Sequence, residues 1–414
     1  MPHWPMPLKI SQTRVNLEHM AFLMKQLGDP HLKLPSIIHI AGTNGKGSSA
    51  AYLSAIFANS GYRVHVYTSP HLREFNERIV LSGCPIFDDY LTEILEKIRY
   101  VTNDNELNYS FFELTTAAAF VAFSEVPADI LIIETGLGGR LDPTNIILKP
   151  IATMITPISY DHMEYLGPTL PIIASEKAGI IKHKVPCIIS AQTPEVFEML
   201  LSKCEEMQAS SIAFGYDYMI SKEKKEFVVE SSGFYEKFPF PKLLGDHQIL
   251  NAGAVIAGIL SGCFKDFKLS TDNIKAGLKN VVWPARLEKI KCLGIDVIID
   301  GAHNSGGAQV LSLWMKDNVK KPISLILGMT KNRDAKLFSS YFKDIVDDIY
   351  CVRVMSEPSS YTAEKLASLI EPNSISTIIC TNLEEAIIKA FDKGNSIIIT
   401  GSLFLAADAM NIRQ

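Results

Sequence analysis

The chain has few cysteines, and they are not placed as a disulfide or zinc framework would require. Its 414 residues include seven of them, scattered along the sequence and never spaced as C-x-x-C. An odd number of dispersed cysteines is typical of reduced thiols in a cytoplasm. We therefore expect a cytoplasmic protein whose fold depends on neither disulfides nor zinc.

The sequence also lacks a strong charge of either sign and any long apolar run. Its net charge of −5 offers no general surface for polyanions, so nucleic acid is not expected as a partner. The N-terminal M-P-H-W-P-M-P-L-K has no apolar core of the length that a signal peptide needs. The most apolar predicted helix, residues 252–260, is too short to cross a bilayer. These absences predict a soluble protein without a membrane partner, and we expect a monomer.

Apolar residues are plentiful instead. They make up 47% of the chain while charged residues make up 21%, which is typical of a globular protein with a large core. The length exceeds that of one ordinary core and favours two domains. The pattern breaks at V-V-W-P (281–284), so we expect one domain of residues 1–283 and another of residues 284–414.

The most informative stretch is P-S-I-I-H-I-A-G-T-N-G-K-G-S-S, residues 35–49. It begins with an apolar run typical of a buried strand and leads into a predicted helix that starts at Ser48. Glycines between them let backbone N–H groups approach an anion, and the helix N-terminus adds partial positive charge. The common pattern G-x-x-x-x-G-K-[ST] fits imperfectly, because Gly47 separates Lys46 from Ser48. An ordinary strand-to-helix turn is the alternative, but the lysine and the serine favour phosphate binding.

Polar residues follow three further apolar runs, at the point where each predicted strand ends. The runs are residues 63–68, 129–134 and 151–158, and the polar residues at or after their ends include Ser69, Glu134 and His162. Strands alternating with helices imply a parallel sheet, whose ligands lie beyond the carboxyl ends of the strands. The four strand ends should therefore surround one crevice.

A magnesium site is predicted there, because a bound phosphate implies Mg²⁺ and this ion prefers hard oxygen ligands. Glu134 ends an apolar strand where an acid has no packing reason to be, although it can merely cap the next turn. Ser69 offers a hydroxyl but precedes a proline, which equally suits turn chemistry. Histidine is a minor magnesium ligand, so His162 can simply form a hydrogen bond.

The rest of the chain predicts appended antiparallel strands over residues 213–240 and then a second, smaller strand–helix series. In this second series Asp300 and His303 repeat the pattern of a strand end followed by polar residues. Arg286, just past the boundary, is either a phosphate contact or a surface arginine. On residue type alone, Lys177 is an exposed lysine beside Glu176 on an otherwise apolar helix.

These motifs together resemble the folylpolyglutamate synthase/dihydrofolate synthase family of Mur-type ATP-dependent amide ligases. The resemblance covers nearly the whole chain and is carried by motifs in one order: H-I-A-G-T-N-G-K-G-S (39–48), T-S-P-H-L-R-E-F-N-E-R-I (68–79), E-T-G-L-G-G-R-L-D-P-T-N (134–145), D-H-M-E-Y-L-G (161–167), S-E-K-A-G-I-I-K (175–182), D-G-A-H-N (300–304) and G-S-L (401–403). It implies an α/β fold with an N-terminal phosphate-loop ATPase domain on a parallel sheet, appended antiparallel strands and a smaller C-terminal Rossmann-like glutamate-ligase domain.

The resemblance also assigns roles to residues. It implies ATP contacts at Asn44, Gly45, Lys46, Gly47, Ser48, Asn251, Arg286 and Asp300. It implies two Mg²⁺ ions held through Ser69, Glu134 and His162, and a carbamylated Lys177 near them. The implied catalytic residues are Lys46, Lys177 and His303, and the implied substrate contacts are Phe112, Asp142, His303 and Ser402. The chain departs from the family at Pro143, where alanine is frequent, directly after the implied pterin contact Asp142.

The function implied is the ATP-dependent addition of L-glutamate to dihydropteroate, giving dihydrofolate, and to reduced folates, giving polyglutamates. Three alternatives stay open: a folylpolyglutamate synthase only, a Mur-type amino-acid ligase acting on another carboxylate, and a phosphate-loop ATPase or nucleotide switch. The S-P-H-L and G-L-G-G-R-L-D motifs speak against the cell-wall type of ligase.

Overall fold

The computed structural model describes residues 17–102 and 109–412. The chain divides into two compact units: Met1–Lys242 with Gln248–Val281, and Leu243–His247 with Val282–Gln414. Each unit has its own central sheet, and both units combine helices with strands that are mainly parallel.

The first unit is built on an eight-stranded sheet with the order β4-β3-β2-β5-β1-β6-β7-β8. All strands from β2 to β8 in this order are parallel, and β3 and β4 extend one edge as an antiparallel hairpin. The bounds are β1 (Ser36–Ala41), β2 (Val64–Tyr67), β3 (Ile79–Leu81), β4 (Cys84–Pro85), β5 (Ile130–Glu134), β6 (Ala152–Ile155), β7 (Cys187–Ile189) and β8 (Ser211–Ala213).

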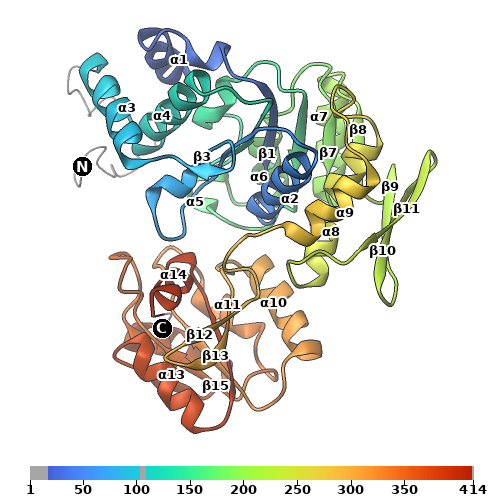
Figure 1. The fold of residues 1–414 in the computed structure, drawn as a ribbon. Helices are drawn as coiled ribbons and strands as arrows, with labels where there is room; N and C mark the ends of the chain where they lie inside the picture. The colour runs from blue at the N-terminus through green and yellow to red at the C-terminus, as the bar shows by residue number, and fades with distance from the viewer. Residues whose placement is uncertain (1–16, 103–108, 413–414) are drawn as a thin grey trace. The chain divides into compact units, whose positions relative to one another are not determined.

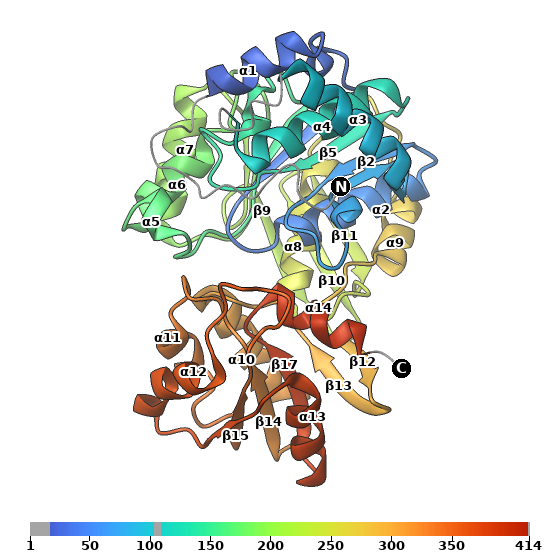
Figure 2. The same ribbon diagram turned by 90° about the vertical axis from the view of Figure 1, so that its left-hand side faces the viewer.

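Helices cover both faces of this sheet (Figures 1 and 2). One face carries α1, α3 and α4 over β1, β2 and β5, with α6 and α7 over β6 and β7. The other face carries α2, which packs against α9, and α8, whose Gly258 approaches Ile188 of β7. The bounds are α1 (Leu17–Gln26), α2 (Lys46–Asn59), α3 (Asp88–Val101), α4 (Phe111–Glu125), α5 (Met163–Leu166), α6 (Leu170–Ala178), α7 (Pro194–Glu206), α8 (Asp246–Leu260) and α9 (Thr271–Asn280).

The central strands are apolar along their length because helices bury both of their faces. All five residues of β5 and the last five of β1 are buried, as expected of a parallel sheet covered on both sides. The strand predicted over residues 151–158 ends earlier, at Ile155. Pro157 has no N–H for the ladder, and its carbonyl instead accepts hydrogen bonds from the amides of Thr43 and Asn44.

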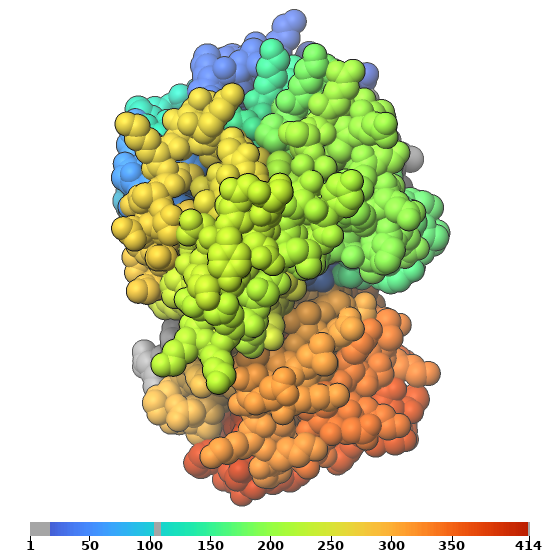
Figure 3. Space-filling view, turned by 90° about the vertical axis from the view of Figure 1, so that its right-hand side faces the viewer, coloured from blue at the N-terminus to red at the C-terminus, as the bar shows by residue number. Residues whose placement is uncertain are grey.

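The antiparallel strands expected after residue 213 form a separate sheet with the order β11-β10-β9. They are β9 (Tyr218–Lys222), β10 (Glu226–Ser231) and β11 (Phe234–Pro239). This sheet, yellow-green in Figure 3, packs onto α8, where the Ile220 side chain lies against Gly253. A Cβ at position 253 would come within 2.4 Å of Ile220, so glycine permits this close approach. The prediction of appended antiparallel strands is confirmed.

The second unit has a six-stranded sheet with the order β12-β13-β17-β14-β15-β16. Five strands are parallel, and β12 joins one edge antiparallel to β13. The strands are β12 (Glu288–Cys292), β13 (Ile295–Ile299), β14 (Ile323–Leu327), β15 (Asp348–Cys351), β16 (Thr377–Ile379) and β17 (Ser396–Thr400). The helices are α10 (Ser305–Asn318), α11 (Ala335–Ser340), α12 (Ala363–Ile370), α13 (Leu383–Asp392) and α14 (Leu403–Asn411).

This architecture confirms the predicted α/β fold class. Among the described residues, none of the helices combines the length and the apolar character that a membrane span requires.

Candidate active site

The sheet of the first unit brings the polar strand ends together. Strands β2, β5, β1 and β6 are consecutive neighbours in it, so the residues after Tyr67, Glu134, Ala41 and Ile155 leave the same edge. The chain runs from β1 to β2 on one side and from β6 to β7 on the other, which makes this edge a topological switch point. The predicted adjacency of the four strand ends is confirmed.

The phosphate loop starts its helix two residues earlier than predicted, at Lys46. Gly45 is the residue before the first turn and has a φ of 86°. The loop is fixed from the side, because the Thr43 hydroxyl donates to Ser159 O at 3.1 Å and the Asn44 amide donates to Ser159 Oγ at 3.0 Å. The first amides of α2 have no partners within the helix, so they present N–H groups to an anion.

Lys46 and Glu134 form the charged centre of this edge. The Lys46 ammonium lies 3.6 Å from Glu134 Oε1 and donates to Thr43 O at 3.3 Å. Only 5% of the surface of Glu134 is exposed. A buried carboxylate needs a cation nearby, and here it comes from the phosphate loop. The two residues therefore place one positive and one negative group side by side at this edge of the sheet.

A buried amide links the phosphate-loop helix to α8. The Gln248 side chain donates to Ser48 Oγ at 3.2 Å and accepts from the Tyr52 hydroxyl at 3.3 Å and from the Asn251 amide at 3.4 Å. Sequence reasoning gave Gln248 no role, because its partners Ser48 and Tyr52 are about 200 residues away in the chain. Its position explains how Ser48 and Asn251, two predicted ATP contacts, come to lie near each other.

Gly45 offers a test of this arrangement with a matched control. A Cβ there would lie 2.7 Å from Asn251 Oδ1, whereas a Cβ on Gly61 would meet nothing within 4 Å, and both glycines have a φ of 86°. The left-handed backbone should therefore cost each alanine variant about 1 kcal/mol of stability. Only Gly45→Ala should also displace Asn251, and we expect its KM for ATP to rise about tenfold in steady-state assays. A similar KM in both variants would contradict this contact.

Lys177 is buried, so the interpretation of an exposed lysine on α6 is wrong. Only 4% of its surface is exposed, and its ammonium donates to Gly42 O at 2.8 Å, at the start of the phosphate loop. Burial, with a smaller effect from the nearby Lys46 ammonium, lowers the pKa of Lys177 to about 7. A large fraction of this amine is therefore neutral near pH 7 and able to act as a nucleophile.

Asp142 holds the glycine-rich loop that follows β5. Its carboxylate accepts hydrogen bonds from the amides of Gly136 and Leu137, both at 2.9 Å, and from the amide and the hydroxyl of Thr144. Burial raises its pKa, and these donors oppose the rise. The sequence did not predict this use of Asp142 within its own loop. Its predicted contact with the pterin stays a prediction.

Phe112 lies beside the same loop, at the first turn of α4. A Cβ on Gly136 would come within 2.3 Å of the Phe112 ring, so the loop and the ring are in close contact. The ring is half-buried and lies 6.1 Å from that of Tyr67. This position leaves an aromatic surface next to the end of β2.

The other two predicted metal ligands lie in the loops after β2 and β6. Ser69 precedes Pro70 with a cis peptide bond, and His162 has a φ of 49° directly before α5. Its Nε2 lies 3.7 Å from Asp161 Oδ1. No group of three or more His, Cys, Asp and Glu side chains suited to a metal occurs within residues 17–102 and 109–412.

The predicted residues of the second unit gather at the end of β13. Asp300 accepts hydrogen bonds from the amides of Leu287, at 3.0 Å, and Ala302, at 2.9 Å. Burial raises its pKa, and the positive charge of Arg286 opposes the rise. His303 Nδ1 donates to Gly301 O at 2.9 Å, which orients the imidazole ring. Ser402 is buried at the start of α14, and its hydroxyl accepts from the Phe404 amide at 3.1 Å.

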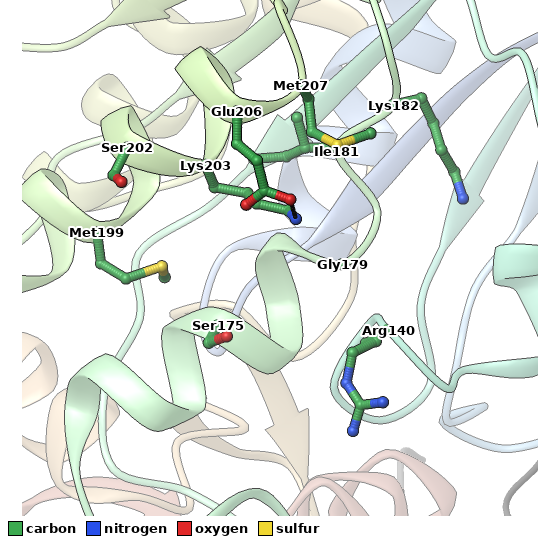
Figure 4. Close-up of a pocket in the computed structure, with 10 residues that line it drawn as sticks. All are labelled: Arg140, Ser175, Gly179, Ile181, Lys182, Met199, Ser202, Lys203, Glu206 and Met207. Carbon is green, nitrogen blue, oxygen red and sulfur yellow. Dashed lines mark hydrogen bonds and ion pairs between the residues drawn. The ribbon is translucent and has the colours of Figure 1, made fainter.

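A surface cavity of about 410 Å³ lies elsewhere, between α6, α7 and the loop after β5 (Figure 4). Three cationic side chains line it, but Arg140 pairs with Glu176 at 2.9 Å and Lys203 pairs with Glu206 at 2.6 Å. The third, Lys182, donates to Asn145 O at 3.2 Å. These charges are satisfied within the protein, so the cavity does not compete with the phosphate loop as a candidate active site.

A phosphate loop at the switch point of a parallel sheet, followed by a second α/β unit, is the arrangement of Mur-type ligases. Residues 40–259 match the Mur ligase middle domain, and residues 285–403 match the Mur ligase glutamate ligase domain. The chain belongs to the folylpolyglutamate synthase/dihydrofolate synthase family of these ligases.

Individual relatives show how far the similarity extends. The dihydrofolate synthase/folylpolyglutamate synthase of Bacillus subtilis (strain 168) is 32% identical over 95% of this chain and 93% of its own length. The structure of E. coli FolC in complex with DHPP and ADP has a TM-score of 0.87 and 28% identity, covering 98% of this chain and 94% of that one. The structure of the Yersinia pestis bifunctional enzyme complexed with AMPPNP and an Mn ion has a TM-score of 0.86 and 26% identity. The match covers 98% of this chain and 95% of that one.

Proposed function

We propose that this chain is a bifunctional ATP-dependent ligase that adds L-glutamate to dihydropteroate and to reduced folates. The observation that carries the proposal is the Lys46–Glu134 pair at the switch point of the sheet, 3.6 Å apart at the start of a phosphate-loop helix. Relatives that carry both activities in their names match almost the whole chain, including those of Bacillus subtilis and Escherichia coli. The two compact units would correspond to an ATP-binding domain and a glutamate-ligase domain.

The chemistry requires activation of a carboxylate, because a carboxylate does not condense with an amine in water. An oxygen of the acceptor carboxylate attacks the γ-phosphorus of ATP, the bond to the bridging oxygen breaks, and ADP leaves. The α-amine of L-glutamate then attacks the acyl phosphate and loses a proton as inorganic phosphate departs. Lys46 and the first amides of α2 are placed to stabilise the charge on the transferring phosphoryl group.

Mg²⁺ would neutralise phosphate charge when bound, and Glu134, Ser69 and His162 are the residues proposed to hold it. Glu134 suits this role because its buried carboxylate already faces a cation. A carbamate on Lys177 is proposed as well. Carbon dioxide adds to a neutral amine, and this amine has a pKa of about 7. The carbamate would turn a buried cation into an anion, which can lie beside metal ions.

The other predicted contacts complete the proposed site. Asn44, Gly45, Gly47, Ser48 and Asn251 would bind the nucleotide, and so would Arg286 and Asp300 of the second unit. His303 would lie near the incoming L-glutamate, and Ser402 would contact a substrate. Phe112 and Asp142 would contact the pterin.

Release of ADP tests the proposal against the nucleotide-switch alternative. Dihydropteroate and tetrahydrofolate are offered separately, each with and without L-glutamate. We expect turnover to require an acceptor together with glutamate. Stimulation by tetrahydrofolate alone among the acceptors would reduce the function to folylpolyglutamate synthesis. Full turnover without acceptor and glutamate would indicate an ATPase instead.

A further inference from the structure

Arg78 is a buried cation near the candidate active site. It is the last residue of a short 3-10 helix, Phe75–Arg78, directly before β3. Its carbonyl accepts a hydrogen bond from the Thr68 amide at 3.1 Å, which fixes the backbone against the end of β2. Only 8% of its surface is exposed. Burial of a guanidinium is unfavourable unless charge or hydrogen bonds compensate for it.

The protein holds this side chain firmly but leaves its outer nitrogens available. Arg78 Nε donates to His71 Nδ1 at 2.8 Å, and Cζ lies 5.5 Å from the centre of the Phe75 ring and 5.6 Å from that of Phe111. Within the described part of the chain, no carboxylate forms an ion pair with Arg78, and its two Nη atoms have no hydrogen-bond acceptor. A guanidinium that is oriented on one edge and open on the other is preorganised for a planar anion.

The strand order relates Arg78 to the phosphate loop. Arg78 lies beside the end of β2 on one side of β5, and Lys46 follows β1 on the other side. Glu134, at the end of β5, lies between them and contacts Lys46 at 3.6 Å. Burial lowers the pKa of Arg78, and electrostatic interactions with Tyr67 and, to a smaller extent, Glu134 oppose that effect. Neighbouring strands lie about 4.8 Å apart, so the three spacings from β3 to β1 amount to roughly 14 Å. The long side chains of Arg78 and Lys46 can reach toward each other and shorten this distance.

We propose that Arg78 binds the carboxylate of a folylglutamate acceptor that does not react. This inference rests on the proposed function. Dihydropteroate has one carboxylate, and that group must reach the phosphate of ATP. A reduced folate has two carboxylates on its terminal glutamate, and only one of them is activated, so the other stays charged throughout the reaction.

The idle carboxylate is a better partner for Arg78 than the reacting one. The reacting carboxylate transfers its charge to the phosphoryl group, so a tight ion pair with it would stabilise the substrate more than the transition state. An ion pair with the idle carboxylate is the same in both states and contributes to binding alone. Arg78 is therefore a specificity residue that supports the extension of folates and has little part in dihydrofolate formation.

Kinetics with the two acceptors test this assignment. In Arg78→Met, which keeps an apolar stem between the two rings, we expect kcat/KM for tetrahydrofolate to fall about 10- to 100-fold, mainly through KM. The value for dihydropteroate should change less than threefold. Arg78→Lys keeps the charge but not the two-donor edge, and should give an intermediate loss. Arg63→Met is the matched control, because Arg63 is exposed and pairs with Asp129 at 3.0 Å, and both acceptors should be used normally.

A change in the acceptor provides an independent test of the same contact. A tetrahydrofolate analogue with γ-aminobutyrate in place of glutamate keeps the reacting carboxylate and lacks the idle one. The wild-type protein should use it as poorly as Arg78→Met uses tetrahydrofolate, and Arg78→Met should lose nothing further with it. The assignment would be overturned if Arg78→Met lost as much kcat/KM with dihydropteroate as with tetrahydrofolate. It would also be overturned if the wild type used the analogue normally. A wild type that uses neither dihydropteroate nor tetrahydrofolate would instead overturn the proposed function.

Discussion

Lys177→Ala is expected to reduce glutamate ligation by about 10²- to 10³-fold while ATP still binds, because removal of one preorganised charge from a phosphoryl-transfer site has effects of this size. The Lys177 ammonium donates to Gly42 O, but Lys177 itself lies on α6, outside the phosphate loop. The affinity for ATP should therefore stay within threefold of that of the wild type. Turnover and ATP titration on the same preparation measure the two quantities. Lys97→Ala, which removes an exposed lysine paired with Glu125 at 3.1 Å, is the matched control. Unchanged turnover in Lys177→Ala would remove the carbamate from the mechanism.

The carbamate itself can be detected without an activity assay. Protein equilibrated with ¹³C-bicarbonate should show one carbamate resonance that is absent from Lys177→Ala. Because carbon dioxide reacts with the neutral amine, and the pKa of Lys177 is lowered to about 7, the occupancy at fixed dissolved carbon dioxide should fall as the pH is lowered through 7. An ordinary lysine is neutral in only roughly one molecule in 3,000 at that pH. A resonance that persists in Lys177→Ala would assign the carbamate to another amine.

Glu134→Gln should cause the second large loss of turnover. The substitution keeps the shape of the side chain but removes the charge 3.6 Å from Lys46, together with a proposed metal ligand. We expect the Mg²⁺ concentration for half-maximal turnover to rise at least tenfold, and turnover at saturating Mg²⁺ to fall about 10²-fold. Titration of turnover with Mg²⁺ measures both effects.

The control is Glu125→Gln, since Glu125 is exposed and contacts Lys97 and Tyr90 away from the phosphate loop. It should leave the Mg²⁺ titration unchanged. The Glu134 carboxylate can alternatively serve as a cap for the turn that follows β5. In that case Glu134→Gln would lower the thermal stability and leave the Mg²⁺ dependence as it was.

The sheet and its polar edge could be predicted because both depend on short, contiguous segments of the sequence. Apolar runs such as residues 129–134 give buried strands, and a polar residue such as Glu134 at the end of a run marks the functional edge. The glycines and the lysine of the phosphate loop are contiguous, so their chemistry is visible without the fold. Strand β3 and the two-residue β4 were missed, since such short edge strands have little periodicity.

What could not be predicted depends on partners that are distant in the sequence. Burial of Lys177 requires Gly42, 135 residues away, and the position of Gln248 requires Ser48, 200 residues away. Arg78 lies inside a motif that carries the family resemblance, T-S-P-H-L-R-E-F-N-E-R-I. The neighbouring residues in the sequence do not show that two phenylalanine rings lie against it. Asp142 likewise looks like a free acid until the fold supplies four donors from its own loop.

The most direct test of carboxylate activation by ATP uses dihydropteroate whose carboxylate carries ¹⁸O. If its oxygen attacks the γ-phosphorus, each turnover with L-glutamate should place one ¹⁸O atom in the inorganic phosphate, detectable by mass spectrometry or ³¹P NMR. The same label should be absent from ADP. Phosphate released without ¹⁸O while the amide forms, or label recovered in AMP, would contradict an acyl-phosphate ligase at this site.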